Sequence, residues 1–116
     1  MQLYSCKKNF AVQKAERFFK ERRVQLQQVD LKKVKPGLRE LQLFARCAGG
    51  AKELIDRTST AVLSHPIAYT DDEAVILDYL TEHPEFLRTP IVRDGQRVVI
   101  GEDAEGWQRL LDKMQR

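Results

Sequence analysis

The sequence has few of the residues that usually mark a chemical site. Its 116 residues include two cysteines, Cys6 and Cys47, and two histidines. The cysteines lack the spacing of a disulfide framework or a zinc site. No apolar run approaches the roughly 18 residues that a membrane span requires, and a strand signal begins at once without a signal peptide. The sequence therefore predicts a cytoplasmic, reduced protein with no metal and no membrane contact.

Both histidines stand beside prolines, His65 before Pro66 and His83 before Pro84. Each falls at or near the end of an expected helix. We interpret them as surface or capping residues and not as metal ligands.

The charge balance is only mildly basic. Twenty Lys and Arg stand against 17 Asp and Glu, which gives a formal net charge of +3. This bias is compatible with an anionic ligand but does not indicate nucleic-acid binding. Length and composition are those of one globular domain spanning residues 1–116.

The first third of the chain predicts a strand, a helix and a second strand. Met1–Ser5 is the first strand, a helix begins at about Asn9, and Val24–Leu31 alternates apolar and polar residues as strands do. Asn9 is a suitable N-cap because its side-chain oxygen can accept from a free amide of the first turn. A βαβ unit of this length predicts parallel strands with a right-handed crossover.

Residues 32–88 read as a helical insertion between the second and third strands. A helix with Pro36 in its first turn is predicted to end at Gly49-Gly50, a short helical piece covers 51–55, and 57–69 is predicted to be irregular. The next helix is expected to begin with Thr70 as its N-cap and Glu73 as the partner in a capping box. It stops before Pro84.

The last third predicts a hairpin and a helix. Asp94-Gly95 lies between two short apolar runs, which is a strong hairpin signal. The final helix, from about Asp103 to Met114, is expected to bury Ala104, Trp107, Leu110, Leu111 and Met114.

The predicted fold is α/β: a thioredoxin-like mixed four-stranded sheet in the order β-α-β, helical insertion, β-β-α, with helices on both faces. Thr89-Pro90, at the start of the third strand, is predicted to be cis.

Several motifs in the predicted order resemble those of the arsenate reductase (ArsC) and Spx family of bacterial-type, thioredoxin-fold proteins. The resemblance covers nearly the whole chain. The matching segments are Tyr4 to Lys8, Gln13-Lys14-Ala15, Val29-Asp30-Leu31, Leu54 to Thr58, Glu82 to Arg93, and Ile100-Gly101 followed by Trp107.

The resemblance implies a specific chemistry that this sequence does not carry. Enzymes of the family place a nucleophilic cysteine at the N-cap of the first helix, which is Asn9 here, and the regulators' Cys-x-x-Cys pair would fall at Asn9 and Val12. Of the arginines that hold the oxyanion, Arg57 matches one. Thr89 stands where the second is expected, with Arg88 one residue earlier, and Gly101-Glu102 offers no third.

The candidate site is the tip of the first helix with the segment before the third strand. Free amides and a helix dipole favour an anion at such a tip. The residues expected to bind an oxyanion or a thiol ligand there are Lys7, Lys8, Asn9, Phe10, Ala11, Val12, Arg57, Arg88, Thr89 and Pro90.

Two functions remain open from the sequence. One is a non-catalytic or divergent family member that acts as a binding or regulatory module, with glutaredoxin or RNA polymerase as the protein partner that the resemblance implies, and no direct nucleic-acid binding. The other is an arsenate reductase-like or glutathione-dependent thiol oxidoreductase that uses Cys6, beside Lys7 and Lys8, as its nucleophile, with no cofactor beyond glutathione as co-substrate. Cys47, near a helix C-terminus, is expected to be structural.

Overall fold

The computed structural model describes residues 1–7 and 9–114. Twelve elements follow one another along these residues: β1 Gln2–Ser5, α1 Phe10–Glu21, β2 Gln27–Asp30, α2 Leu38–Ala48, η1 Ala51–Leu54, α3 Thr60–Leu63, η2 Pro66–Tyr69, α4 Glu73–Glu82, η3 Pro84–Phe86, β3 Ile91–Asp94, β4 Arg97–Ile100 and α5 Ala104–Met114. The η elements are single turns of 3-10 helix.

The strands form one mixed sheet in the order β2-β1-β3-β4. β1 pairs with β2 in parallel and with β3 antiparallel, and β3 pairs with β4 antiparallel through the turn at Gly95-Gln96. The predicted βαβ unit, hairpin and four-stranded mixed sheet are confirmed. The Thr89-Pro90 peptide bond is cis, as the sequence predicts.

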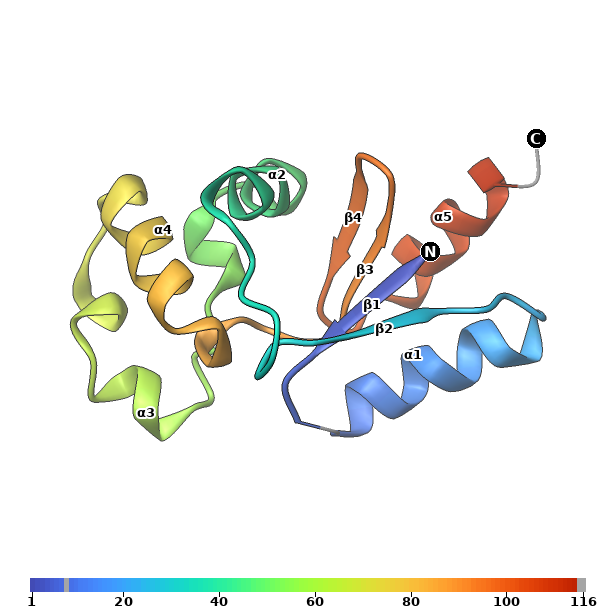
Figure 1. Cartoon of the computed structure of the whole chain (residues 1–116), viewed down its shortest axis with the longest axis horizontal. Helices are drawn as coiled ribbons and strands as arrows, with labels where there is room; N and C mark the ends of the chain where they lie inside the picture. Colours follow the sequence, from blue (N-terminus) through green and yellow to red (C-terminus); the bar gives the residue numbers. More distant parts are fainter. Residues whose placement is uncertain (8, 115–116) are drawn as a thin grey trace.

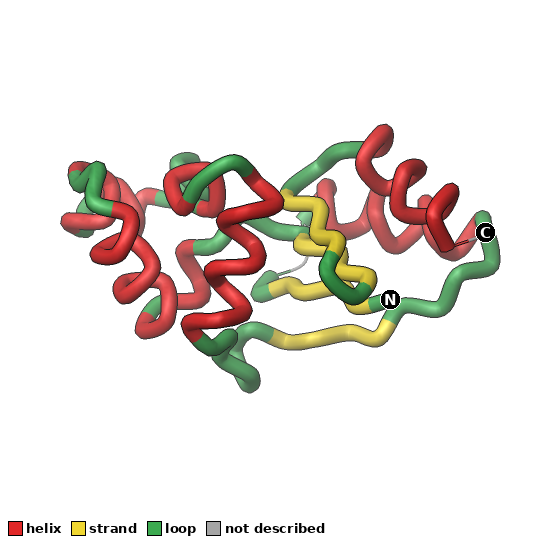
Figure 2. Tube along the Cα trace, turned by 90° about the horizontal axis from the view of Figure 1, so that it is seen from above, coloured by secondary structure: helices red, strands yellow, loops and turns green. Residues whose placement is uncertain are grey.

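Helices cover the sheet on both sides (Figure 1). α1 and α5 lie on one face, and α2, α3 and α4 lie on the other; the view from above shows the same three layers (Figure 2). Each face has its own apolar core. Leu3, Phe19, Val92 and Trp107 belong to the α1/α5 side, whereas Tyr4 belongs with Phe44 and most of the helical insertion on the other side.

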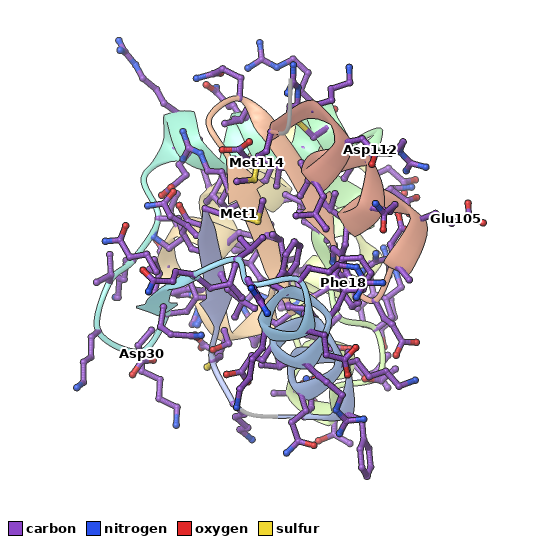
Figure 3. All side chains as sticks on the ribbon, turned by 90° about the vertical axis from the view of Figure 1, so that its right-hand side faces the viewer. Met1, Phe18, Asp30, Glu105, Asp112 and Met114 are labelled. Atoms are coloured by element: carbon purple, nitrogen blue, oxygen red, sulfur yellow. The ribbon has the colours of Figure 1, made fainter. Side chains whose placement is uncertain are left out.

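The α1/α5 side is closed by aromatic packing. The Phe18 ring lies 5.5 Å from that of Trp107 and 5.1 Å from that of Phe19, measured between ring centroids. Figure 3 shows Phe18 between the two helices. None of the described helices is long and apolar enough to cross a membrane.

The second strand is shorter than predicted. The sequence pattern runs from Val24 to Leu31, but pairing begins only at Gln27, whose N–H donates to the carbonyl of Met1 at 2.9 Å. β1 itself begins at Gln2, so Val24 has no strand beside it to pair with. Its side chain packs against the α1/α5 core instead.

The stretch 57–69 was predicted to be irregular, and this is wrong because it contains α3 and η2. His65 begins η2: its Nδ1 accepts from the N–H of Ile67 at 3.0 Å. His83 is the C-cap of α4. The interpretation of both histidines as capping residues is therefore confirmed.

The predicted capping box of α4 does not form, because the N-cap lies two residues later than predicted. Asp72 is the N-cap, and its Oδ1 accepts from the N–H groups of Ala74 and Val75. Thr70 accepts from Asp72 through its own hydroxyl, and Glu73 accepts from the N–H of Ala51. Glu73 thus ties α4 to η1, a tertiary contact that no local sequence pattern contains.

Two of the five residues predicted to be buried in the last helix are exposed. Ala104 is at the first turn of α5, and Met114 at its end is 44% exposed. Trp107, Leu110 and Leu111 are buried as predicted. The buried residues of this helix are thus its central ones, and the two exposed ones lie at its ends.

A partly buried polar contact joins β1, α2 and β3. The hydroxyl of Tyr4 donates to Glu40 Oε2 at 2.5 Å, and Nη1 of Arg93 donates to the same oxygen at 2.7 Å. Burial, and after it the hydrogen bond to the Glu40 carboxylate, raise the pKa of Tyr4 to about 12.

This raised pKa makes stability depend on pH in the alkaline range. The folded state holds the Tyr4 proton more tightly than the unfolded chain, whose tyrosines ionise near pH 10. The stabilisation is therefore complete below about pH 10 and is lost as the pH rises toward about 12. Near-ultraviolet phenolate absorbance should show one tyrosine that titrates late. Urea unfolding at each pH should show the parallel loss of stability.

The Glu40→Gln variant is the control. It removes the carboxylate that opposes the phenolate but leaves the burial, so Tyr4 should ionise at a lower pH than in the parent and still above about 10. Simultaneous titration of every tyrosine at the ordinary pH in the parent would contradict the prediction.

Candidate functional site

A pocket of about 360 Å³ lies where four chain segments meet at the N-terminus of α1. We call it the tip pocket. Its lining comes from the α1 cap, the turn after η1, the segment before β3 and the turn after β4: Asn9, Asp56, Thr58, Arg88, Thr89, Gly101 and Glu102. Of the ten residues predicted for the site, Asn9, Arg88 and Thr89 line this pocket.

Asn9 is the N-cap of α1, as predicted. Its Oδ1 accepts from the N–H of Val12 at 2.8 Å, and its carbonyl accepts from the N–H of Gln13. Its Nδ2 lies 3.5 Å from Thr89 Oγ1, the upper limit for a hydrogen bond. Asn9 therefore joins the helix tip to the residue before the cis proline, Pro90, and uses the Val12 amide for the cap.

The other first-turn residues lie around the pocket rather than in its lining. Phe10 is 84% exposed, Ala11 is half-buried, and the Val12 side chain belongs to the α1/α5 core. Phe10 and Ala11 come before the first N–H that can be bonded within the helix. Their amides have no hydrogen-bond acceptor among the described residues.

Arg88 is held at the pocket by two contacts. Its backbone N–H donates to the carbonyl of Leu54 at 2.7 Å, and its Nη2 donates to the carbonyl of Ile100 at 3.1 Å. The guanidinium lies against Gly101, which has φ +78; a Cβ built there would come within 2.8 Å of Arg88 Nη2. Gly101 leaves the space that the arginine occupies.

Two carboxylates also face the tip pocket, and the sequence reasoning did not count them. Asp56 Oδ1 accepts from both the N–H and the hydroxyl of Thr58, at 3.0 and 2.6 Å. Glu102 pairs with Lys14 at 2.8 Å. Both carboxylates lie in segments that the family resemblance marks, 54–58 and 101–102. The negative residues of these segments were therefore a signal in the sequence for the mixed charge of the site. The pocket has mixed charge.

Several predicted residues lie elsewhere. Arg57 is exposed and does not line the pocket; its Nη1 lies 3.5 Å from the carbonyl of Ala68. The hydrogen bond from Lys52 lowers the pKa of Asp71, and the charge of Arg57 lowers it further to a smaller extent. Lys7 is exposed outside the lining, and Lys8 lies outside the described residues.

The cysteines lie apart from the tip pocket. Cys6 follows β1 and packs, half-buried, against the core on the α2 side of the sheet. Cys47 is exposed on α2, and its Sγ lies 3.5 Å from the carbonyl of Gln96. Within residues 1–7 and 9–114, no group of three or more His, Cys, Asp or Glu side chains could hold a metal ion.

Substitution of Gly101 tests whether the position of Arg88 depends on the space that this glycine leaves. Gly101→Ala puts a side chain at a positive φ, which costs about 1–2 kcal/mol, and it also forces the guanidinium away. Gly95→Ala is the matched control, because Gly95 has φ +62 with no atom near its Cβ position. Urea unfolding should show a larger loss for Gly101→Ala.

The same pair of variants should differ in the arginine itself. The side-chain N–H resonances of Arg88 should move in Gly101→Ala and stay in place in Gly95→Ala. Equal losses of stability with an unmoved Arg88 signal would mean that the glycine serves only the turn.

Comparison with known proteins identifies what this architecture resembles. The sequence model of the ArsC family matches residues 4–110. None of the curated proteins matches the chain in sequence.

Solved structures match over nearly the full length. A putative ArsC family related protein from Bacteroides fragilis is 18% identical, with a TM-score of 0.81 over 94% of this chain and 95% of its own. The YffB (PA3664) protein is 20% identical, with a TM-score of 0.78 and coverages of 93% and 96%. An arsenate reductase from Vibrio cholerae is 14% identical, with a TM-score of 0.79 and 97% of both chains covered. At these identities the likeness shows the fold, which is the thioredoxin-like α/β fold of ArsC structures.

Proposed function

The chain belongs to the ArsC family, and from this premise we propose that it acts as a binding module that does not reduce arsenate. The observation that carries the proposal is the cap of α1. The position where the family resemblance implies a thiolate holds Asn9, whose side chain is already engaged with Val12 and Thr89. An amide cannot form the covalent bond to arsenic that the family's reaction requires.

Cys6 is a poor substitute for the missing thiol. It comes three residues before the cap, outside the tip-pocket lining, and half-buried against the core on the opposite side of the sheet from α1. It does not hold the cap position, which is Asn9 and at which helix-terminus amides activate a thiol. These observations favour a packed thiol over a nucleophile.

The charges of the tip pocket favour a particular ligand class. Arg88 can receive a carboxylate or oxyanion, whereas Asp56 and Glu102 repel a simple oxyanion and attract an amine. Glutathione carries carboxylates, an amine and a thiol, so it suits this mixed lining better than phosphate or arsenate does. The protein partners implied by the family, glutaredoxin or RNA polymerase, remain part of the proposal on the family resemblance alone.

Amide chemical shifts can test the ligand class. Addition of glutathione at millimolar concentration should move the resonances of residues 9, 88, 89, 101 and 102 more than equal phosphate or arsenate does. Exposed charges contribute only about 0.2–1 kcal/mol each, so added salt should weaken the binding. Arg88→Gln should abolish these shifts, and Arg57→Gln, the control outside the pocket, should retain them. Unmoved shifts at the pocket, or equal losses in both variants, would reject it as the ligand site.

Arsenite release in the presence of glutathione and glutaredoxin tests the absence of reductase activity. The parent chain should show no detectable turnover, whereas a typical enzyme turns over at about 10 per second. The Cys6→Ser variant should give the same result as the parent. Asn9→Cys should create a thiol that alkylating reagents modify faster than Cys6, because it sits at the helix N-terminus. Parent turnover that disappears in Cys6→Ser would instead support the alternative, a thiol oxidoreductase that uses Cys6.

A further inference from the structure

We propose that the outer edge of β4 binds an extended acidic peptide segment, which would add to the sheet as a fifth strand. This goes beyond the proposed function, because it concerns a surface outside the tip pocket and does not depend on it. The inference rests on three features: unpaired backbone groups, a groove along the strand, and the charge of that groove.

β4 is the last strand of the sheet in the order β2-β1-β3-β4, and β3 is its sheet neighbour among the described residues. The N–H of Gly101 donates to the carbonyl of Pro90 at 2.8 Å. In an antiparallel ladder, hydrogen-bonded pairs alternate with unbonded pairs. The residues of β4 that bond to β3 are therefore Val99 and Arg97, at steps of two before Gly101. The backbone groups of Val98 and Ile100 point away from β3, toward the open edge of the sheet.

Not all of these outward groups are available. The carbonyl of Ile100 already accepts from Arg88 Nη2. The N–H and C=O of Val98 and the N–H of Ile100 have no partner among the described residues. These three groups are spaced as an incoming strand would need them, with Arg88 closing the end of the row.

A groove of about 380 Å³ runs along this edge between the end of α2 and α5. Cys47 and Gln96 lie at one end, and Val99 and Leu110 supply apolar surface inside it. A bound strand presents alternate side chains to opposite sides. One set of its side chains would therefore enter the groove.

The charge of the groove specifies what those side chains should be. Its lining includes Arg97, Arg109 and Lys113 and no Asp or Glu. Arg97 and Lys113 have no ion-pair partner among the described residues, and Arg109 has only a long contact of 3.8 Å with Asp103. The carboxylate of Glu105 on α5 points away from the body of the molecule (Figure 3). A segment whose groove-facing side chains include both acidic and apolar residues matches both the cations and the apolar floor.

A peptide fits these features better than a nucleic acid does. Single-stranded nucleic acids bind largely by stacking bases on aromatic side chains, and the groove lining contains no aromatic residue. The unpaired N–H and C=O groups of Val98 match the backbone of a peptide, whereas a nucleic acid has no such ladder to offer.

The test uses the full chain and the capped hexapeptide Val-Val-Glu-Glu-Val-Val, which presents both Val and Glu on each face of an extended strand. Amide shifts should move at Val98 and Ile100, and hydrogen exchange of these two amides should slow because they gain acceptors. The double variant Arg97→Glu/Lys113→Glu should weaken binding about tenfold or more. Lys32→Glu/Lys33→Glu, which makes the same net charge change in an exposed loop, should bind as the parent does.

A second form of the peptide separates strand addition from charge attraction. N-methylation of alternate amides removes the backbone donors and leaves the carboxylates in place. Binding should be lost with this peptide. Unchanged binding of the methylated peptide, no shift at Val98, or tighter binding of a single-stranded oligonucleotide at the same amides would each overturn the proposal. If Val98 does not shift, the cations would serve to prevent edge-to-edge pairing of sheets. If the oligonucleotide binds more tightly, they would serve to bind nucleic acid.

Discussion

The structure depends on the burial of both faces of the two central strands. Leu3 and Tyr4 are adjacent in β1, point to opposite faces of the sheet, and are 0% and 3% exposed. Val92 and Ile91 repeat this in β3, and both are 0% exposed. A strand buried on both faces needs helices on both, so α1 and α5 must lie on one side and the insertion on the other. The same arrangement brings the α1 tip beside the segment that enters β3.

This arrangement explains why a site forms at the α1 tip whatever residue caps the helix. Asn9, Arg88 and Gly101 come from three distant parts of the chain, and the sheet order brings them to one pocket. The scaffold therefore sets the location of the pocket, and the residue at the cap sets which groups face it. With Asn9 at that position, the cap side chain accepts a hydrogen bond from the amide of Val12.

Arg88 links this site to the outer edge of the sheet. Its guanidinium lines the tip pocket and also occupies the last outward carbonyl of β4, at Ile100. The tip pocket and the edge groove differ in charge, because the first contains Asp56 and Glu102 and the lining of the second contains no carboxylate. Two surfaces of different charge thus meet at one arginine.

The sequence by itself determined the features that depend on neighbouring residues. The Asn9 cap and the Asp94-Gly95 hairpin are local patterns, and both appear where they were predicted. The predicted fold added the position of the cis proline, and the family motifs identified Asn9 as the position at which the family's enzymes carry a thiol. Local patterns also misled: Thr70 and Glu73 have the spacing of a capping box, but Glu73 bonds to Ala51 instead.

Only the tertiary structure decided which charges meet. The sequence offered Lys7, Arg57 and Arg88 as candidates, with Arg57 at a position that the family resemblance implies, and the fold brings Arg88 alone of these three to the pocket. It placed Asp56 and Glu102 there as well, and it gathered Arg97, Arg109 and Lys113 along one strand edge. Side-chain charges far apart in sequence have no local pattern that records their distance. Their meeting depends on strand order and helix packing, which the whole chain sets together.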